Sequence, residues 1–230
     1  MGPEATATLY LNIVGRCQRE LDAKYNSDFP PIIVNSAPVP DGRMWKGFNE
    51  AEVKRFLRTN IRILERSGVD FVAIPCNSVH YFLPIMRKAV NIPVLSIVEE
   101  TAKEIKNTGL SKVLLLATEF TIYRGIYEQP LAEREITLIK PSRTQQRLLE
   151  KIIIRTESGQ RSNTDRGTVV GIINDLRKTA GIQGVVAGCT EIPLLIQQID
   201  TPVQLFDTID VLAASSYALI RGKQTFDPYR

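Results

Sequence analysis

Two short stretches decide the fold: Phe71-Val72-Ala73-Ile74-Pro75-Cys76-Asn77-Ser78 and Val185-Val186-Ala187-Gly188-Cys189-Thr190-Glu191. Each has a short apolar run, a turn residue, a cysteine and then small polar residues. Such a run is typical of a buried strand in a parallel sheet. The residues that directly follow such a strand lie at the carboxyl edge of the sheet. We therefore expect both thiols at carboxyl edges of parallel strands.

The two stretches belong to a longer internal repeat. Gly68 and Cys76 map onto Gly181 and Cys189 at one common offset of 113 residues. A Pro-Val pair follows each cysteine at a similar distance. A match of this kind indicates duplication. Two similar halves facing each other would bring the thiols to opposite walls of one cleft.

Composition narrows the class of protein. The chain has 230 residues, of which 43% are hydrophobic, enough for a substantial core. The formal charge is +4, but acidic and basic residues alternate, which is typical of solvated helix faces rather than a nucleic-acid surface. No stretch has the length of a membrane span or the pattern of a secretory signal. Three cysteines without zinc spacing indicate a reducing cytoplasm and no metal site.

Strand and helix patterns alternate along the chain, which predicts an α/β fold with parallel sheets. We expect two pseudo-symmetric, doubly wound domains with the active site in the cleft between them. The first would span residues 1–97, with a C-terminal helix in 207–230 packing back on it, and the second residues 98–206.

The expected elements follow from apolar periodicity and from Gly, Pro and capping residues. Helices are expected at 3–25, 50–66, 79–89, from 118, 144–156, 167–179 and 208–220. Besides the two cysteine strands, strands are expected at 32–34, 94–97, 112–117, 136–139 and around Pro202. Cys17 falls on the apolar stripe of the first helix and is interpreted as a core residue.

The strand ends carry the chemistry. Ligands of open parallel sheets bind beyond the carboxyl ends of strands, where Cys76, Thr118 and Cys189 are expected. Free backbone N–H groups there attract a carboxylate and favour a thiolate. A thiolate on one wall and a thiol on the other suit removal of a proton from one face of a carbon and its return to the opposite face.

Other interpretations of the cysteines exist. A buried, inert cysteine is common, and this interpretation would be favoured for either residue alone. Two cysteines in matched contexts favour a functional interpretation. A disulfide between them would block the cleft, and a reducing compartment disfavours it.

These residues also carry a family resemblance. Pro75-Cys76-Asn77-Ser78-Val79-His80 resembles the first cysteine motif of the cofactor-independent aspartate/glutamate racemases, and Gly188-Cys189-Thr190-Glu191-Ile192-Pro193 resembles their second. Residues 1–7 are similar to the segment that follows the family's first strand, and Leu116-Ala117-Thr118 to a mid-chain strand end. The resemblance covers nearly the whole chain.

The resemblance implies an amino-acid racemase that works without pyridoxal phosphate or another cofactor, usually as a homodimer. It implies Cys76 and Cys189 as the two bases. It implies substrate contacts from Met1, Arg43, Asn77, Ser78, Val79, Thr118, Thr190 and Glu191. His80 is expected to orient its turn or to pack, because two thiols already supply acid and base.

The chain departs from the family pattern in three places. Members begin with an apolar strand before Met-Gly-Pro, so we expect a mis-set or truncated start here, with two unpaired strand edges and an exposed apolar flank. Arg43, expected to grip a side-chain carboxylate, follows an inserted Gly. The position of a Lys that aspartate-type members carry falls at 157–158, where this chain has Glu and Ser. Arg155 and Arg161 are nearby candidates to replace that Lys.

These observations favour a racemase of aspartate or glutamate. The alternatives are a related carbanion enzyme such as a hydantoin racemase, and a non-catalytic amino-acid-binding protein that has lost its first strand. A small-molecule acidic amino acid is the expected partner, with no nucleic acid and no membrane.

Overall fold

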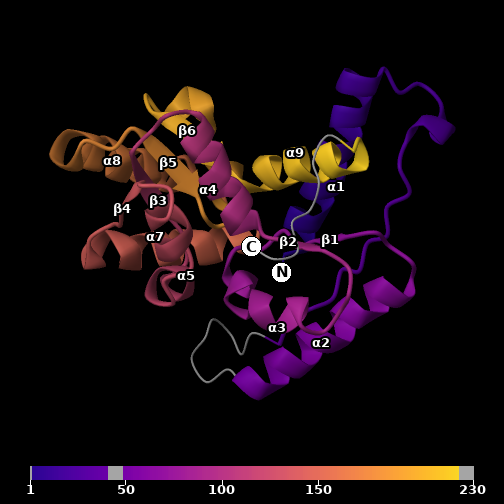
Figure 1. Ribbon diagram of the computed structural model, residues 1–230. Coiled ribbons are helices and arrows are strands. Elements are labelled where there is room, and N and C mark those ends of the chain that lie inside the picture. Colours follow the sequence, from indigo (N-terminus) through magenta and orange to yellow (C-terminus); the bar gives the residue numbers. More distant parts are fainter. Residues whose placement is uncertain (1, 41–48, 223–230) are drawn as a thin grey trace.

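The protein is an α/β fold built on two parallel sheets, seen in a computed structural model that describes residues 2–40 and 49–222 (Figure 1). The first sheet pairs β1 (Val72–Ala73) with β2 (Val94–Leu95). The second contains, in spatial order, β4 (Thr137–Ile139), β3 (Lys112–Leu116), β5 (Gly184–Ala187) and β6 (Gln204–Asp207). The predicted fold class is confirmed.

The helices follow the strands in alternation, as in other doubly wound folds. They are α1 (Pro3–Leu21), α2 (Glu50–Arg66), α3 (Leu83–Arg87), α4 (Ile97–Asn107), α5 (Glu119–Tyr123), α6 (Glu128–Ala132), α7 (Arg143–Glu157), α8 (Asn163–Ala180) and α9 (Thr208–Ile220). Short 3₁₀ turns lie at Asn26–Asp28, Ser78–Phe82, Ile192–Leu194 and Gln198–Asp200. No helix in the described ranges is both long and apolar enough to cross a membrane.

Helices α2 and α9 begin and end at the predicted residues, because their caps are encoded locally. The Asn49 side chain accepts bonds from the N–H groups of Ala51 and Glu52. Asp207 does the same for α9, accepting from Ile209 and Asp210. A side-chain oxygen at this position satisfies backbone donors that the helix itself leaves unpaired.

The duplicated segments adopt the same local structure. Gly68 and Gly181 both have left-handed backbone, with φ of 78° and 67°. Each lies a few residues before the strand that leads to a cysteine. In the first sheet Val72 is opposite Val94, and in the second Val185 is opposite Leu205, so each cysteine strand pairs in parallel with the next strand of its half.

Several predicted elements are wrong. Residues 32–34 form no strand; Ile33 and Val34 are about half exposed, and β propensity without a neighbouring strand to pair with does not make one. The helix predicted at 79–89 is instead a 3₁₀ turn followed by α3, which starts where Pro84 enters the first turn. The strand around Pro202 begins only at Gln204, two residues after the proline, which has no N–H to donate.

Helix boundaries differ from prediction at three further places. Ser96 caps α4, so the strand predicted at 94–97 stops at Leu95 and an eleven-residue helix follows it directly. Helix α8 starts at Asn163 rather than 167 because the Ser162 side chain caps it. Helix α1 ends at Leu21 rather than 25, where Asp22 takes left-handed backbone.

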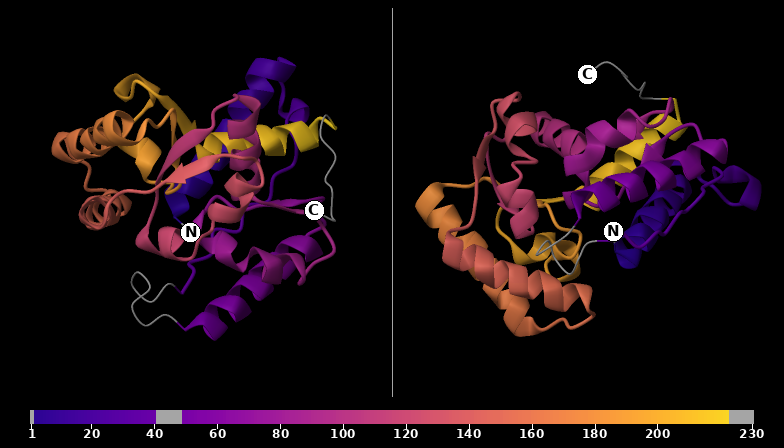
Figure 2. Two further views of the ribbon diagram at one scale, coloured as in Figure 1. Left: turned by 60° about the vertical axis from the view of Figure 1, so that its left-hand side comes forward. Right: turned by 90° about the horizontal axis from the view of Figure 1, so that it is seen from below.

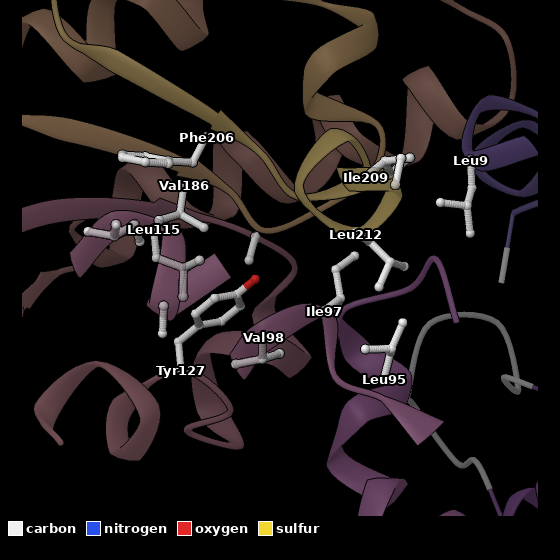
Figure 3. Packing of buried hydrophobic residues seen from close by; sticks show 14 of the residues in the cluster. Leu9, Leu95, Ile97, Val98, Leu115, Tyr127, Val186, Phe206, Ile209 and Leu212 are labelled. Carbon is white, nitrogen blue, oxygen red and sulfur yellow. The ribbon is translucent and has the colours of Figure 1, made fainter. Parts of the chain in front are cut away.

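Alternate residues of the second sheet face two hydrophobic clusters. Leu114 and Leu116 of β3 point into the cluster formed with α7 and α8, whereas Val113 and Leu115 point into the opposite cluster. That second cluster, drawn in Figure 3, also takes residues from α1, α4 and α9 and reaches Leu95 of the first sheet. Helix α9 packs against both α1 and α4 (Figures 1 and 2). One shared core therefore joins the two sheets.

An apolar groove of about 740 Å³ opens beside the first sheet. Leu9 and Ile13 of α1 line it, as do Leu57 and Ile61 of α2 and the extended residues 30–37. In the part of the chain that the structure describes, β1 is paired with β2 alone, so its other edge faces this groove. The division of the chain into residues 1–97 with 207–230 and residues 98–206 stays a prediction.

We predict that Gly188→Ala destabilises the protein by about 1–3 kcal/mol, the usual cost of overpacking. A Cβ at Gly188 would lie 2.4 Å from Cδ1 of Leu115 and 3.2 Å from Cβ of Ala117, and both residues are fully buried. The matched control is Gly171→Ala, in exposed helix with no atom within 4 Å of the added Cβ. That change should stabilise by about 0.4–1 kcal/mol. Urea unfolding measures both, and a Gly188→Ala protein as stable as wild type would contradict the prediction.

Candidate active site

The two predicted thiols lie after matching strands. Cys76 follows β1 and is half-buried, and Cys189 follows β5 with 8% of its surface exposed. Both are free thiols. Two hydrogen bonds, from Asn77 to Thr208 and from Thr208 to Ala187, link the residue after Cys76 to the strand that precedes Cys189. The fold brings together two residues that are 113 positions apart.

The Cys189 thiol is held in its protonated form. Burial raises its pKa well above the ordinary value, and the neighbouring Glu191 carboxylate raises it further. The Sγ–H of Cys189 donates to Oε2 of Glu191 at 2.8 Å, and the Thr190 hydroxyl donates to the same oxygen at 3.0 Å. The other carboxylate oxygen faces the start of α1, since a Cβ added at Gly2 would lie 3.5 Å from Oε1.

A cluster of three hydroxyl groups forms a second part of the site. Ser78 Oγ lies 3.3 Å from Thr118 Oγ1 and 3.1 Å from Thr121 Oγ1, and the two threonine oxygens are 3.1 Å apart. Thr118 caps α5 at the carboxyl end of β3. All three side chains are at least nine-tenths buried. The loop after β1 and the end of β3 thus present polar groups at one place.

Asn77 belongs to a buried network that crosses between the sheets. Its Oδ1 accepts from the Tyr127 hydroxyl at 2.5 Å, and its Nδ2 donates to Thr208 Oγ1 at 3.1 Å. The Thr208 hydroxyl in turn donates to the carbonyl of Ala187, in β5, at 3.0 Å. Burial raises the pKa of Tyr127, so its hydroxyl stays a neutral donor.

His80 is bonded on both ring nitrogens. Nε2 accepts from the backbone N–H of Ile97 at 3.1 Å, so the ring proton sits on Nδ1 and is donated to the Cys76 carbonyl at 2.7 Å. Burial lowers the pKa of His80, which keeps the ring neutral. These contacts tie the turn after Cys76 to the first residue of α4, which matches the expected orienting role.

The other residues expected to contact substrate do not join the described cluster. Met1 and Arg43 lie outside the described residues, as does Trp45. The Val79 side chain is buried in the hydrophobic cluster beneath α2 and α3, which leaves only its backbone available for a ligand. Arg155 and Arg161, the candidates for the missing Lys, are paired with Asp165 and Glu4.

Sequence reasoning missed three residues of this site. Thr121 stands one helical turn after Thr118, and Thr208 directly follows β6, so the strand-end argument applied more widely would have found both. Tyr127 stands before α6, far in sequence from any cysteine, and no local pattern marks it. Within the described ranges, no three His, Cys, Asp or Glu side chains group together as metal ligands would.

The geometry suits proton transfer at a carbon that carries a carboxylate. A buried thiol and a more exposed thiol stand at the ends of equivalent strands. Hydroxyl and amide donors from Ser78, Thr118 and Asn77 lie on the same edge. Such donors stabilise the negative charge that develops when a proton leaves the carbon beside a carboxylate.

Comparison with known proteins identifies relatives along the full length. A family model described as Asp/Glu/Hydantoin racemase matches residues 1–215. The broad specificity amino-acid racemase RacX of Bacillus subtilis (strain 168) is 27% identical over 225 residues, covering 98% of this chain and 97% of the relative.

Two solved structures have the same fold. An aspartate racemase homologue from Pyrococcus horikoshii OT3 superposes with a TM-score of 0.80 and 30% identity, covering 95% of both chains. The Picrophilus torridus aspartate racemase also has a TM-score of 0.80, at 24% identity, covering 100% of this chain and 94% of its own. At that lower identity the second match supports the fold alone.

We predict that Glu191→Gln lowers the pKa of Cys189. The carboxylate charge and its hydrogen bond both favour the protonated thiol, while burial continues to raise the pKa in the variant. The measurement is the pH dependence of iodoacetamide alkylation in a chain whose Cys17 and Cys76 are replaced by Ala, so that Cys189 is the one thiol present. Glu104→Gln, an exposed change on α4, is the control and should leave the midpoint unchanged. An unchanged or higher midpoint in Glu191→Gln would contradict the assigned role of the carboxylate.

Proposed function

The chain belongs to the Asp/Glu/hydantoin racemase family and is an enzyme of the amino-acid racemase type, and we propose that it inverts Cα of acidic amino acids with Cys76 and Cys189 as its two bases. The observation that carries the proposal is the pair of free thiols at the ends of equivalent strands, whose loops are linked through Asn77, Thr208 and Ala187. No cofactor takes part in the proposed reaction.

The two thiols would exchange one proton each with the substrate. In one direction Cys76, as a thiolate, takes the Cα proton, and the electron pair of the broken C–H bond moves into the carboxylate as an enediolate. The Cys189 thiol gives its proton to the opposite face of the carbon. Cys76 is then a thiol and Cys189 a thiolate, and the roles reverse for the other enantiomer.

Glu191 supports the half-reaction in which Cys189 acts as the base. A thiol with a raised pKa is a strong base once ionised but is rarely ionised near neutral pH. The Glu191 carboxylate already accepts a hydrogen bond from this thiol at 2.8 Å and is placed to take its proton. We propose that Glu191 acts in this way rather than as a ligand of the substrate ammonium group.

The remaining polar side chains would hold the substrate. Hydroxyl groups of Ser78 and Thr118, the Asn77 amide and the hydroxyl of Thr190 are proposed to bind the carboxylate and ammonium. Their bonds strengthen as negative charge moves onto the carboxylate, which lowers the barrier to proton removal. Met1, Arg43 and the Val79 backbone stay in the proposal as further substrate contacts.

The side chain of the substrate is the least constrained part of the proposal. Aspartate and glutamate come first, because the Pyrococcus relative is an aspartate racemase homologue. A wider range has support too, since the Bacillus relative is described as having broad specificity. A hydantoin racemase-like activity and non-catalytic amino-acid binding remain the alternatives. We also propose that the protein is cytoplasmic and forms a homodimer. Sedimentation of the purified protein tests the oligomeric state.

The first experiment is deuterium uptake at Cα, followed by NMR in D₂O without added pyridoxal phosphate. The substrates are both enantiomers of aspartate and glutamate, together with alanine, lysine and a 5-substituted hydantoin. Exchange and inversion from both enantiomers of one amino acid support the racemase and identify its substrate. Exchange with the hydantoin alone would replace the proposed substrate class, and binding without exchange would favour the non-catalytic alternative.

We predict that Cys76→Ser and Cys189→Ser each lower the racemisation rate by about 10²–10⁴-fold, the usual contribution of a general acid or base. Each variant keeps one thiol, so residual Cα exchange should be confined to one enantiomer, and to opposite enantiomers in the two variants. The measurement is exchange and inversion followed separately by NMR and chiral chromatography.

The matched control for these variants is Cys17→Ala. Cys17 is fully buried on α1 in the shared hydrophobic cluster, so its loss should reduce stability and leave turnover intact. Racemisation at the wild-type rate by either serine variant would rule out the two-base scheme.

A further inference from the structure

We infer that Tyr127 is a positioning residue for the racemase site: its hydroxyl fixes the orientation of the Asn77 amide and, through it, the spacing of the two cysteine loops. The inference rests on the proposed function, because it assigns the network a purpose in holding substrate between Cys76 and Cys189. Tyr127 belongs to neither cysteine motif and stands 50 residues from Asn77.

The direction of every bond in the network follows from its last acceptor. The Ala187 carbonyl can only accept a hydrogen bond, so the Thr208 hydroxyl is the donor and its one hydrogen is used in this bond. Thr208 Oγ1 must then accept from Asn77, which places the NH₂ group of the amide toward Thr208. Asn77 Oδ1 consequently faces Tyr127, whose hydroxyl must donate to it.

Burial makes this arrangement strict. Asn77 is 2% exposed, and Tyr127 and Thr208 are fully buried. Figure 3 shows the Tyr127 ring beside Leu115 and Val98 of the hydrophobic cluster. Its hydroxyl lies against two polar side chains, Asn77 and Thr101. Losing a buried hydrogen bond typically costs about 1–3 kcal/mol, and the bond to Asn77, at 2.5 Å, is the short one that this hydroxyl makes.

The network joins the backbones that carry the two thiols. Asn77 directly follows Cys76, and Ala187 stands two residues before Cys189 in β5. Two hydrogen bonds in series, from Asn77 to Thr208 and from Thr208 to Ala187, therefore connect the cysteine loop of the first sheet, the start of α9 and the cysteine strand of the second. The third bond holds the Asn77 amide against Tyr127. A rigid link of this kind keeps the two sulfurs at a set separation across the substrate.

The same orientation decides what Asn77 offers to a ligand. The amide group has two N–H hydrogens, and the bond to Thr208 uses one of them. The second is the one that would donate to a substrate carboxylate. If the amide turned over, an oxygen would replace that donor and repel the carboxylate. Tyr127 opposes this flip because the flip would break the bond that its hydroxyl donates to the amide oxygen.

The test is Tyr127→Phe, which keeps the ring and removes the donor. Tyr217→Phe is the matched control, because Tyr217 lies in the same hydrophobic cluster and its buried hydroxyl has no hydrogen-bond partner among the described residues. We expect kcat/KM of Tyr127→Phe to fall about 10–100-fold, equivalent to about 1.4–2.8 kcal/mol. The fall must be equal for the two enantiomers, since their equilibrium constant is one. Tyr217→Phe should retain wild-type kcat/KM.

A second pair of variants separates positioning from stability. Thr208→Val removes the acceptor and should reproduce the Tyr127→Phe defect, whereas Thr208→Ser keeps the hydroxyl and should restore kcat/KM to within about threefold of wild type. This pair also keeps the inference testable if Tyr127→Phe fails to fold. Equal activity of Thr208→Val and Thr208→Ser would overturn it.

One readout is independent of turnover. In ¹⁵N-labelled protein the Asn77 side-chain amide, assigned by its absence from Asn77→Ser, should exchange its hydrogens at least tenfold faster in Tyr127→Phe than in Tyr217→Phe. Unchanged exchange would overturn the inference even if wild-type protein racemised none of the amino acids tested, which would be a failure of the proposed function alone. Racemisation by wild type with unaffected Tyr127→Phe kinetics would overturn the inference and leave the proposed function standing.

Discussion

The structure depends on one hydrophobic cluster shared by its two parallel sheets. Apolar side chains of α1, α4 and α9 meet Leu115 of β3, Val186 of β5 and Leu95 of β2 in a single buried volume (Figure 3). Because protein interiors are densely packed and deform little, this shared core fixes how the sheets sit relative to each other. Because the loops after β1 and β5 are attached to these sheets, the core also determines the relative position of the two thiols.

The two cysteines come from equivalent positions but have different surroundings. Cys189 is buried next to a carboxylate that raises its pKa, whereas Cys76 is half-buried and is followed by the Asn77 network. Equivalent strand ends therefore place the two thiols in unequal surroundings. This inequality is compatible with a racemase. The equilibrium constant between two enantiomers is one, which requires equal kcat/KM in the two directions but does not require the two thiols to have equal pKa values.

Two sets of buried hydrogen bonds lie at the junction of the two sheets. Tyr127, Asn77 and Thr208 bond in series across the interface of the sheets, and His80 ties the first cysteine turn to α4. Satisfied buried networks of this kind specify one arrangement, because any other leaves a donor or acceptor unpaired in an apolar environment. The site is thus positioned by apolar packing and oriented by hydrogen bonds.

The sequence by itself determined the α/β class, the cysteine strands, and helices α2 and α9, because strand burial and helix caps are encoded within a few residues. It also singled out Ser78 with Thr118, and Cys189 with Glu191, since strand ends of a parallel sheet share one edge. Only the tertiary structure decided that residues 32–34 form no strand and that Pro84 divides a helix, because both depend on which neighbours are present. Only the tertiary structure revealed Tyr127, whose bond to Asn77 spans 50 residues and arises from packing that no local pattern records.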